Sequence, residues 1–293
     1  MHHKIYLTEF PESYVLAAEA EPVETAILFV HGFLGHAFDT WVDFQSSIDR
    51  EAGWESADLY FLQYKSFADS VDASVYRFHR FLKRVEQAPE DWFELKAEDL
   101  PPVIRETLRG YRLRSGPTSY RRLLLVGHSL GGVVMRRAIV DEASEYCKRL
   151  EKEAGTEQNV SAPALLQAPV RLFAPAISGA RISGAPGVAL RLGGLGRLAR
   201  LVLGFSPSYQ DLLPGSTIVP NLQKDTTELA QRFPQLPAFR ADILWADRDD
   251  IVTDQKYFWD KNCGRAAGTN HVSVCKPRRS YRQPLDLVTS GEV

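Results

Sequence analysis

Cysteine is scarce in this chain, with three residues among 293, namely Cys147, Cys263 and Cys275. An odd and widely spaced set provides no disulfide framework, and no Cys-x-x-Cys spacing indicates a zinc site. Cys263 and Cys275 could pair, but we expect free thiols that pack as small hydrophobic side chains.

Long apolar runs and a signal sequence are also lacking. Residues Met1 to Glu9 contain no sustained apolar core, and no run is long enough to span a bilayer. The formal net charge is −2, so the whole molecule has no bias toward nucleic acid or acidic partners. We therefore expect a cytoplasmic globular protein with no nucleic-acid partner.

Short apolar segments alternate with helical patterns along the chain. Apolar runs predict strands at 26–30, 58–62, 123–126, 170–174 and 243–246, and two shorter runs at 4–7 and 14–18 predict a hairpin across Pro11. Apolar residues recur at helical spacing in 71–82 and 133–140. This alternation predicts an α/β fold, with a mostly parallel sheet covered by helices on both faces. No repeat or linker divides the chain, which indicates a single domain over residues 1–293.

An insertion is predicted at about residues 183–237. The chain carries no acidic residue from Gln158 to Gln210, and this stretch contains the arginines Arg171, Arg181, Arg191, Arg197 and Arg200. One interpretation is a cap helix that packs on the core and leaves its arginines in water. The other is a mobile lid whose segment Arg191–Arg200 contacts an anionic membrane surface or an acidic substrate.

The most informative motif surrounds Ser129. A run of bulky apolar residues ends at Gly127-His128-Ser129-Leu130-Gly131, and a helix-compatible stretch follows. A serine on a sharp strand-to-helix turn occupies strained backbone, and only residues without a Cβ fit beside it. The turn exposes the hydroxyl above the sheet, so Ser129 is a candidate nucleophile.

A serine nucleophile needs a histidine to take its proton and an acid to orient that histidine. His271 is the one histidine C-terminal to Ser129, and it is the candidate base unless an earlier histidine is recruited. Asp247, Asp249 and Asp250 follow the apolar run that ends at Ala246, and each is a candidate acid.

An oxyanion hole is the remaining requirement of this chemistry. The main-chain N–H of Leu130 follows the nucleophile, and the glycine-containing loop 30–35 after an earlier strand offers the N–H of Phe33. His31 and His128 each lie inside a turn motif, where we expect their rings to make structural hydrogen bonds.

Together these residues resemble the α/β-hydrolase superfamily and its lipase-like serine esterases, over nearly the whole chain. Residues 31–35 are similar to the HGxxG oxyanion loop, and residues 127–132 match the elbow GHSLGG. Asp249-Asp250-Ile251-Val252 resembles the D-x-hydrophobic-V acid motif, which selects Asp249 and leaves Asp250 as the runner-up. Residues 271–277 resemble the H-x-x-x-C-K-P ending of a branch related to GPI inositol-deacylase-like and mitochondrial serine-active-site proteins.

The resemblance implies an α/β-hydrolase fold with a cap or lid, and a serine esterase that works through an acyl-enzyme without a cofactor or metal. Its substrate would be a small-molecule or lipid ester. An acyltransferase or thioesterase with the same triad is the nearest alternative, followed by a peptidase or amidase. A hydrolase-like scaffold that only binds a partner is the alternative of another class.

Overall fold

The computed structural model describes residues 3–7, 13–18, 23–48, 54, 57–87, 120–153, 160–180, 204–261 and 263–292. Within these ranges one sheet contains the strands β1 (His3–Leu7), β2 (Tyr14–Ala18), β3 (Thr25–Val30), β4 (Ala57–Leu62), β5 (Arg122–His128), β6 (Val170–Phe173), β7 (Ala241–Arg248) and β8 (Cys263–Asn270). The helices are α1 (Ala37–Ile48), α2 (Val71–Gln87), α4 (Leu130–Glu153), α5 (Ala164–Gln167), α8 (Pro207–Leu212), α9 (Ile218–Arg232) and α10 (Gln283–Ser290), with a 3-10 turn η4 (Pro237–Phe239).

The strand order is β1-β2-β4-β3-β5-β6-β7-β8. β1 and β2 pair antiparallel, which confirms the predicted hairpin, and β2 pairs antiparallel with β4. All the other neighbours pair in parallel, as the alternation of strands and helices predicted. The strand β8 was not expected from the sequence.

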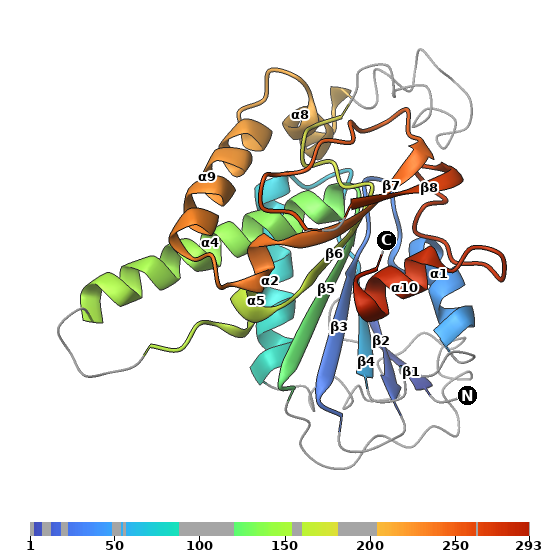
Figure 1. The fold of residues 1–293 in the computed structure, drawn as a ribbon, viewed down its shortest axis with the longest axis horizontal. Helices are drawn as coiled ribbons and strands as arrows, with labels where there is room; N and C mark the ends of the chain where they lie inside the picture. The colour runs from blue at the N-terminus through green and yellow to red at the C-terminus, as the bar shows by residue number, and fades with distance from the viewer. Residues whose placement is uncertain are drawn as a thin grey trace.

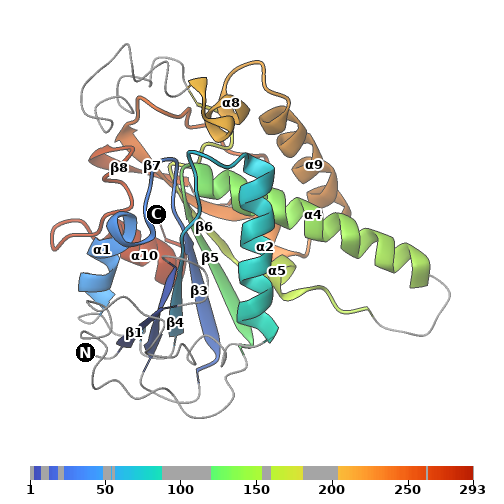
Figure 2. The ribbon, with the colours of Figure 1, turned by 180° about the vertical axis from the view of Figure 1, so that it is seen from behind.

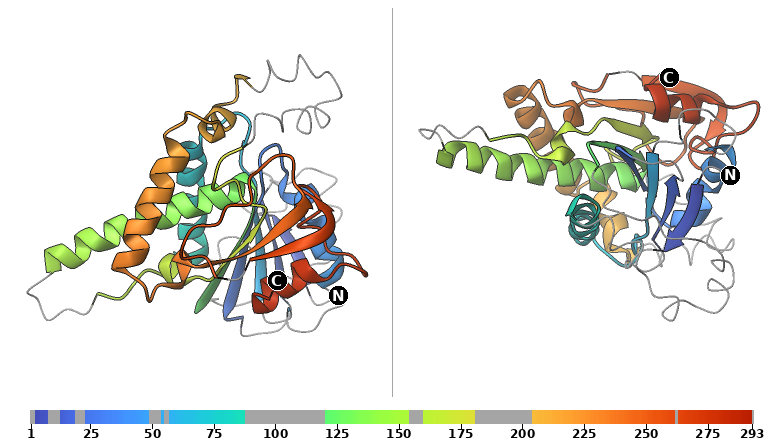
Figure 3. Two further views of the ribbon diagram at one scale, coloured as in Figure 1. Left: turned by 45° about the horizontal axis from the view of Figure 1, so that its top comes forward. Right: turned by 90° about the horizontal axis from the view of Figure 1, so that it is seen from below.

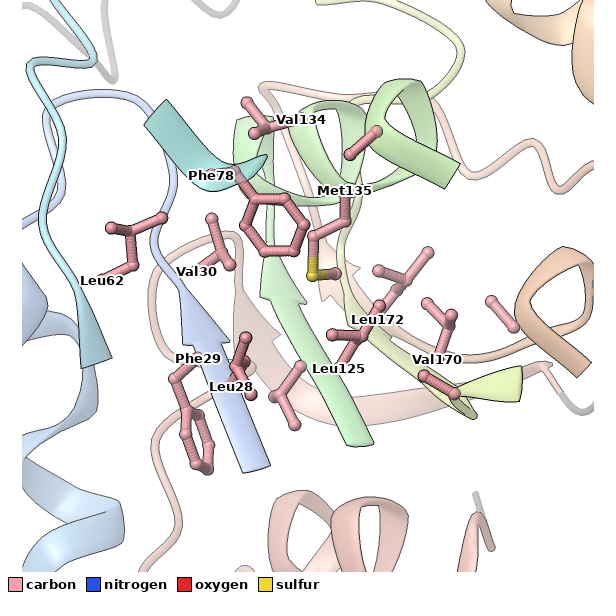
Figure 4. Packing of buried hydrophobic residues seen from close by; sticks show 14 of the residues in the cluster. Leu28, Phe29, Val30, Leu62, Phe78, Leu125, Val134, Met135, Val170 and Leu172 are labelled. Carbon is pink, nitrogen blue, oxygen red and sulfur yellow. The ribbon is translucent and has the colours of Figure 1, made fainter. Parts of the chain in front are cut away.

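Helices cover both faces of the sheet. α2 and α4 lie on one face and α1 and α10 on the other (Figures 1 and 2), and the view from below in Figure 3 separates the two layers. Figure 4 shows side chains of α2 and α4, among them Phe78 and Met135, directed at β3 and β5. On the opposite face Phe29 contacts Trp41 and Phe44 of α1, with ring centroids 5.1 and 5.5 Å away. Burial on both faces explains why the inner strands are continuous apolar runs.

The chain changes direction across the sheet between β3 and β5. From β3 it continues outward to β4, and then crosses back to form β5 on the other side of β3. Loops that leave the carboxyl ends of such neighbouring strands diverge and open a crevice, which is where open α/β sheets bind ligands. Residues 31–35 follow β3 and Ser129 follows β5, so both predicted motifs lie at this crevice.

The described part of the predicted insertion forms α8 and α9, and α9 packs against α4 (Figure 1). The segment Arg191–Arg200 and Arg181 lie outside the described residues. Arg171 does not belong to a cationic lid: it lies in β6 and forms an ion pair with Asp242 on β7. Asp242, which lies outside the acid-free stretch 158–210, therefore neutralises the charge of Arg171.

Two smaller expectations have clear outcomes. Among the described helices, none combines the length and the apolarity needed to cross a bilayer. All three cysteines are free; Cys147 and Cys275 are buried as predicted. Cys263 is exposed at the start of the edge strand β8, so the prediction of a packed thiol is wrong there.

Candidate active site

Ser129 lies on the turn between β5 and α4 with a left-handed backbone, φ 54°. The flanking glycines allow close packing, as the sequence predicted. A Cβ on Gly131 would stand 2.3 Å from the main-chain oxygen of Val30, and one on Gly127 would stand 2.4 Å from Cε of Met135. A Cβ at position 131 would collide with main chain and move the elbow, whereas at position 127 the nearest atom is the movable end of the Met135 side chain and the nearest main-chain atom, N of Gly132, is 3.1 Å away. The strain and the tight packing hold the Ser129 hydroxyl in one place.

Ser129, His271 and Asp249 form a chain of hydrogen bonds. His271 Nε2 lies 2.8 Å from Ser129 Oγ, and His271 Nδ1 lies 2.8 Å from Asp249 Oδ2. Ser129 and His271 are 142 positions apart in the sequence, and the parallel sheet brings them to one edge. The side chains of His271 and Asp249 are 9% and 8% exposed, which limits competition from water.

The environment of Asp249 keeps its carboxylate charged. Burial would raise its pKa, but the hydrogen bond and charge of His271 and the main-chain N–H groups of Val252 and Ile251 outweigh burial and lower the pKa. Both N–H groups donate to Asp249 Oδ1, at 3.0 and 2.9 Å, and leave Oδ2 for the histidine. The other two candidate acids lie elsewhere: Asp247 is exposed and accepts from the N–H of Gly268, and Asp250 is exposed.

The loop after β3 lies directly against the elbow. A Cβ on Gly32 would stand 2.8 Å from Cβ of Ser129, so only glycine permits this approach. Leu34 has a left-handed φ of 53°, and its N–H donates to Ser66 Oγ at 3.0 Å, which fixes the turn. Leu130 is the first residue of α4, where a main-chain N–H has no partner within the helix. Phe33 of this loop lines the pocket at Ser129, and the assignment of the Phe33 and Leu130 N–H groups as oxyanion donors stays a prediction.

Comparison with known proteins agrees with this arrangement at the level of fold. No protein-family model matches the chain, and no curated protein matches it. The mature lipase BlEst2 of Bacillus licheniformis is similar in structure, with 13% identity and a TM-score of 0.50 over 92% of this chain and 94% of that one. Esterase B of Lactobacillus rhamnosis, described with a tributyrin phosphonate, shares 13% identity and a TM-score of 0.51 over 98% and 83%. The chain has the α/β-hydrolase fold.

Within this α/β-hydrolase fold, His31 supports the loop after β3. Its ring is fully buried, stacks on Tyr64 with centroids 4.3 Å apart, and its Nδ1 lies 2.8 Å from the main-chain oxygen of Gly32. Burial lowers the pKa of His31 to about 4, against the smaller opposing effect of the hydrogen bond to Gly32. The ring is therefore neutral, and because its partner is a carbonyl oxygen, Nδ1 carries the proton.

His128 connects the elbow to the loop that carries His271. It is the last residue of β5 and is 6% exposed, and its Nε2 lies 2.7 Å from the main-chain oxygen of His271. The predicted structural role of His31 and His128 agrees with these contacts.

A buried ion pair, which the sequence analysis missed, lies behind the acid loop. Arg136 of α4 pairs with Asp260, and both side chains are almost fully buried. Asp260 also accepts the N–H groups of Ala241 and Tyr257, at 3.0 and 2.9 Å, and Arg136 stacks on the Tyr257 ring. One signal was present in the sequence: Arg136 is a charged residue on the apolar face of the predicted helix 133–140. The pair ties the far end of the loop that carries Asp249 to the helix that follows Ser129.

An apolar pocket opens at Ser129 and His271. Its walls come from the oxyanion loop, the segment after β6, helix α8 and the acid loop, and its apolar side chains include Leu34, Ala180, Tyr209, Leu212 and Ile251. Helix α8, from the predicted insertion, therefore covers part of the candidate site. Among the described residues, no group of three or more His, Cys, Asp or Glu side chains is placed to bind a metal ion.

Proposed function

We propose that this protein is a serine hydrolase that cleaves carboxylic esters through an acyl-enzyme intermediate. The hydrogen-bonded chain from Ser129 through His271 to Asp249, placed on a strained elbow beside two main-chain N–H groups, carries this proposal. Nucleophile, base and orienting acid stand in the relation that nucleophilic catalysis by serine requires.

Acylation begins when Ser129 Oγ attacks the ester carbonyl carbon while its proton passes to His271 Nε2. The carbonyl oxygen becomes an oxyanion, which accepts hydrogen bonds from the N–H groups of Phe33 and Leu130. As the carbonyl re-forms, the bond to the alcohol oxygen breaks, and His271 donates its proton to that oxygen. The alcohol leaves, and the acyl group remains on Ser129.

Deacylation reverses these roles with water as the nucleophile. His271 takes a proton from the water as its oxygen attacks the acyl carbon, and then returns a proton to Ser129 Oγ as the acid is released. Asp249 accepts a hydrogen bond from the Nδ1–H group throughout, which holds the ring in the tautomer whose Nε2 faces Ser129 and stabilises the imidazolium. The lowered pKa of Asp249 suits this role, because it keeps the carboxylate ionised beside the histidine.

The decisive experiment is covalent labelling with a fluorophosphonate, compared between the parent and Ser129→Ala. We expect rapid labelling of the parent, no labelling of the variant, and a loss of ester turnover on the order of 10³-fold or more, because the three residues act as a unit. Undiminished labelling of Ser129→Ala would refute the assignment. Competition between water and an added alcohol or thiol then distinguishes hydrolysis from acyl transfer.

A further inference from the structure

A second pocket lies beside the first, on the other side of the loop after β3. Phe33, Leu34, His128 and Val272 line both pockets, so the two meet at the candidate oxyanion hole. The first pocket is apolar and narrow, about 40 Å³. The second is predominantly polar and much larger, about 330 Å³. An ester bound with its carbonyl between them would extend one part into each.

Besides His128, the polar side chains of the second pocket come from two further segments that belong to the site. His36, Asp39 and Thr40 lie at the start of α1, directly after the oxyanion loop, and Lys276 follows His271 by five positions. Lys276 Nζ donates to the main-chain oxygen of Asp39 at 3.1 Å, which closes the pocket between these two elements. No step of the proposed mechanism uses these four side chains.

The polarity of the two pockets decides which part of the ester enters each. His271 must deliver its proton to the oxygen of the leaving alcohol, and its loop reaches both pockets: Val272 lines both, and His271 itself lines the apolar one. The proton transfer therefore allows the alcohol in either pocket, and a polar alcohol matches the pocket whose lining is polar. The acyl chain, which has no polar atoms beyond its carbonyl, is stabilised by removal from water in the apolar pocket.

The charges of the polar pocket favour a neutral group over an anionic one. Asp39 and Lys276 both line the pocket, and Lys276 Nζ also lies 4.0 Å from Oδ2 of Asp43, which does not line it. The lysine charge is thus balanced by acids, and the pocket offers no net positive charge to a phosphate. Hydroxyl groups, which both donate and accept, match a pocket that offers an ammonium donor and a carboxylate acceptor.

We propose that the polar pocket binds the alcohol of the substrate, and that this alcohol is a neutral polyol such as glycerol or a sugar, esterified with a short acyl chain. The inference rests on the proposed function, because it assigns the two pockets relative to Ser129 and His271. Asp39 and Lys276 are then the residues that set specificity for the alcohol.

The first test varies the alcohol while the acyl group stays butyryl. We expect kcat/KM for 1-monobutyrin to exceed that for propyl butyrate by about tenfold, the effect of one to two additional hydrogen bonds. Butyryl glycerol 3-phosphate should be a poorer substrate than monobutyrin. Equal values for monobutyrin and propyl butyrate, or a preference for the phosphorylated ester, would overturn the proposal.

The second test varies the pocket. Asp39→Asn and Lys276→Met should each reduce the ratio of kcat/KM between monobutyrin and propyl butyrate several-fold. The matched controls are Asp72→Asn, an exposed aspartate in the first turn of α2, and Lys148→Met, an exposed lysine on α4. Both controls should keep the parent's ratio. Since Asp39 is exposed, its variant tests the pocket even if Lys276→Met fails to fold.

Fluorophosphonate labelling separates failure of this inference from failure of the proposed function. A parent protein that is not labelled contradicts the nucleophile itself. A parent that is labelled at Ser129, but whose alcohol preference does not respond to Asp39→Asn, retains its function and contradicts only the assignment of the polar pocket.

Discussion

His128 Nε2 donates a hydrogen bond of 2.7 Å to the main-chain oxygen of His271, and so joins the strand that ends at the nucleophile to the loop that carries the base. The acceptor is a carbonyl oxygen, which fixes the proton on Nε2. The two rings lie 5.0 Å apart without sharing a proton. His128 thus sets the position of the His271 backbone, while Asp249 sets the orientation of the His271 ring.

This contact predicts that His128→Leu lowers kcat by about tenfold to a hundredfold, because a small displacement of a catalytic group is costly. His128→Gln, which keeps a side-chain N–H donor, should recover most of the loss. Steady-state kinetics on a short p-nitrophenyl ester measures both variants, with KM expected to change little. If the leucine and glutamine variants were equally impaired, the hydrogen bond would not be the reason for the effect.

The acid assignment predicts a contrast between neighbouring residues. Asp249→Asn should reduce turnover by orders of magnitude, since the amide neither balances the imidazolium nor holds its tautomer. Asp250→Asn is the matched control, because Asp250 is exposed and is separated from the histidine by the turn that Asp249 forms. Parallel kinetics of the two variants, with circular dichroism to verify folding, measures the contrast. A greater loss in Asp250→Asn would show that the acid is one position further along.

The buried His31 predicts that stability depends on pH. Its pKa is about 4 in the folded protein and near 6.5 when unfolded, so below pH 6.5 the unfolded chain binds more protons. The free energy of unfolding should therefore fall as pH falls from about 6.5 to about 4, with a contribution from His31 of about 2 kcal/mol between pH 7 and pH 5.

Urea denaturation at pH 7 and pH 5 measures this dependence. His31→Asn keeps an N–H donor for the Gly32 oxygen but does not titrate, so the pH-dependent difference should shrink by the same amount. Other groups also titrate in this range, which makes the difference between parent and variant the relevant quantity. Equal pH dependence in the two proteins would contradict the lowered pKa.

The cationic segment Arg191–Arg200 lies outside the described residues, and its role stays a prediction. If it contacts an anionic membrane, the parent should float with anionic liposomes at low salt and be released at high salt, at roughly 1 kcal/mol per basic residue. Arg197→Glu with Arg200→Glu should weaken flotation and spare the hydrolysis of a short soluble ester. A parent that stays in the soluble fraction at low salt would exclude a membrane role for this segment.

Local sequence patterns were sufficient to predict the central strands of the sheet and the motifs that follow them. The strands β3 and β5 are apolar over residues 26–30 and 123–126 because these are buried in the sheet, and Gly131 is required where the elbow meets the main chain of Val30. Apolar runs and glycines of this kind can be recognised in the sequence at the positions where the structure requires them. The elbow and the loop after β3 were therefore predictable.

The edge of the sheet was not predictable for the opposite reason. β8 has the sequence Cys-Gly-Arg-Ala-Ala-Gly-Thr-Asn, which lacks apolar alternation and has Thr269 as its one β-branched residue, and it forms a strand because it pairs with β7. Arg136 and Asp260 are 124 positions apart, and neither residue alone indicates its partner. Contacts of this kind depend on the tertiary fold, which no local pattern encodes.

His271 directly follows the edge strand β8, and this position affects how activity is lost when the protein begins to unfold. Among the described strands β8 pairs with β7 alone; it is largely exposed and buries few side chains of its own. Segments with little buried apolar area open locally, at a lower free energy than global unfolding requires. Detachment of β8 would remove the base from Ser129 while β3 to β7 remained folded. Mild heating or denaturant should therefore abolish activity before secondary structure is lost, so catalysis is a more sensitive measure of the integrity of this protein than its circular dichroism.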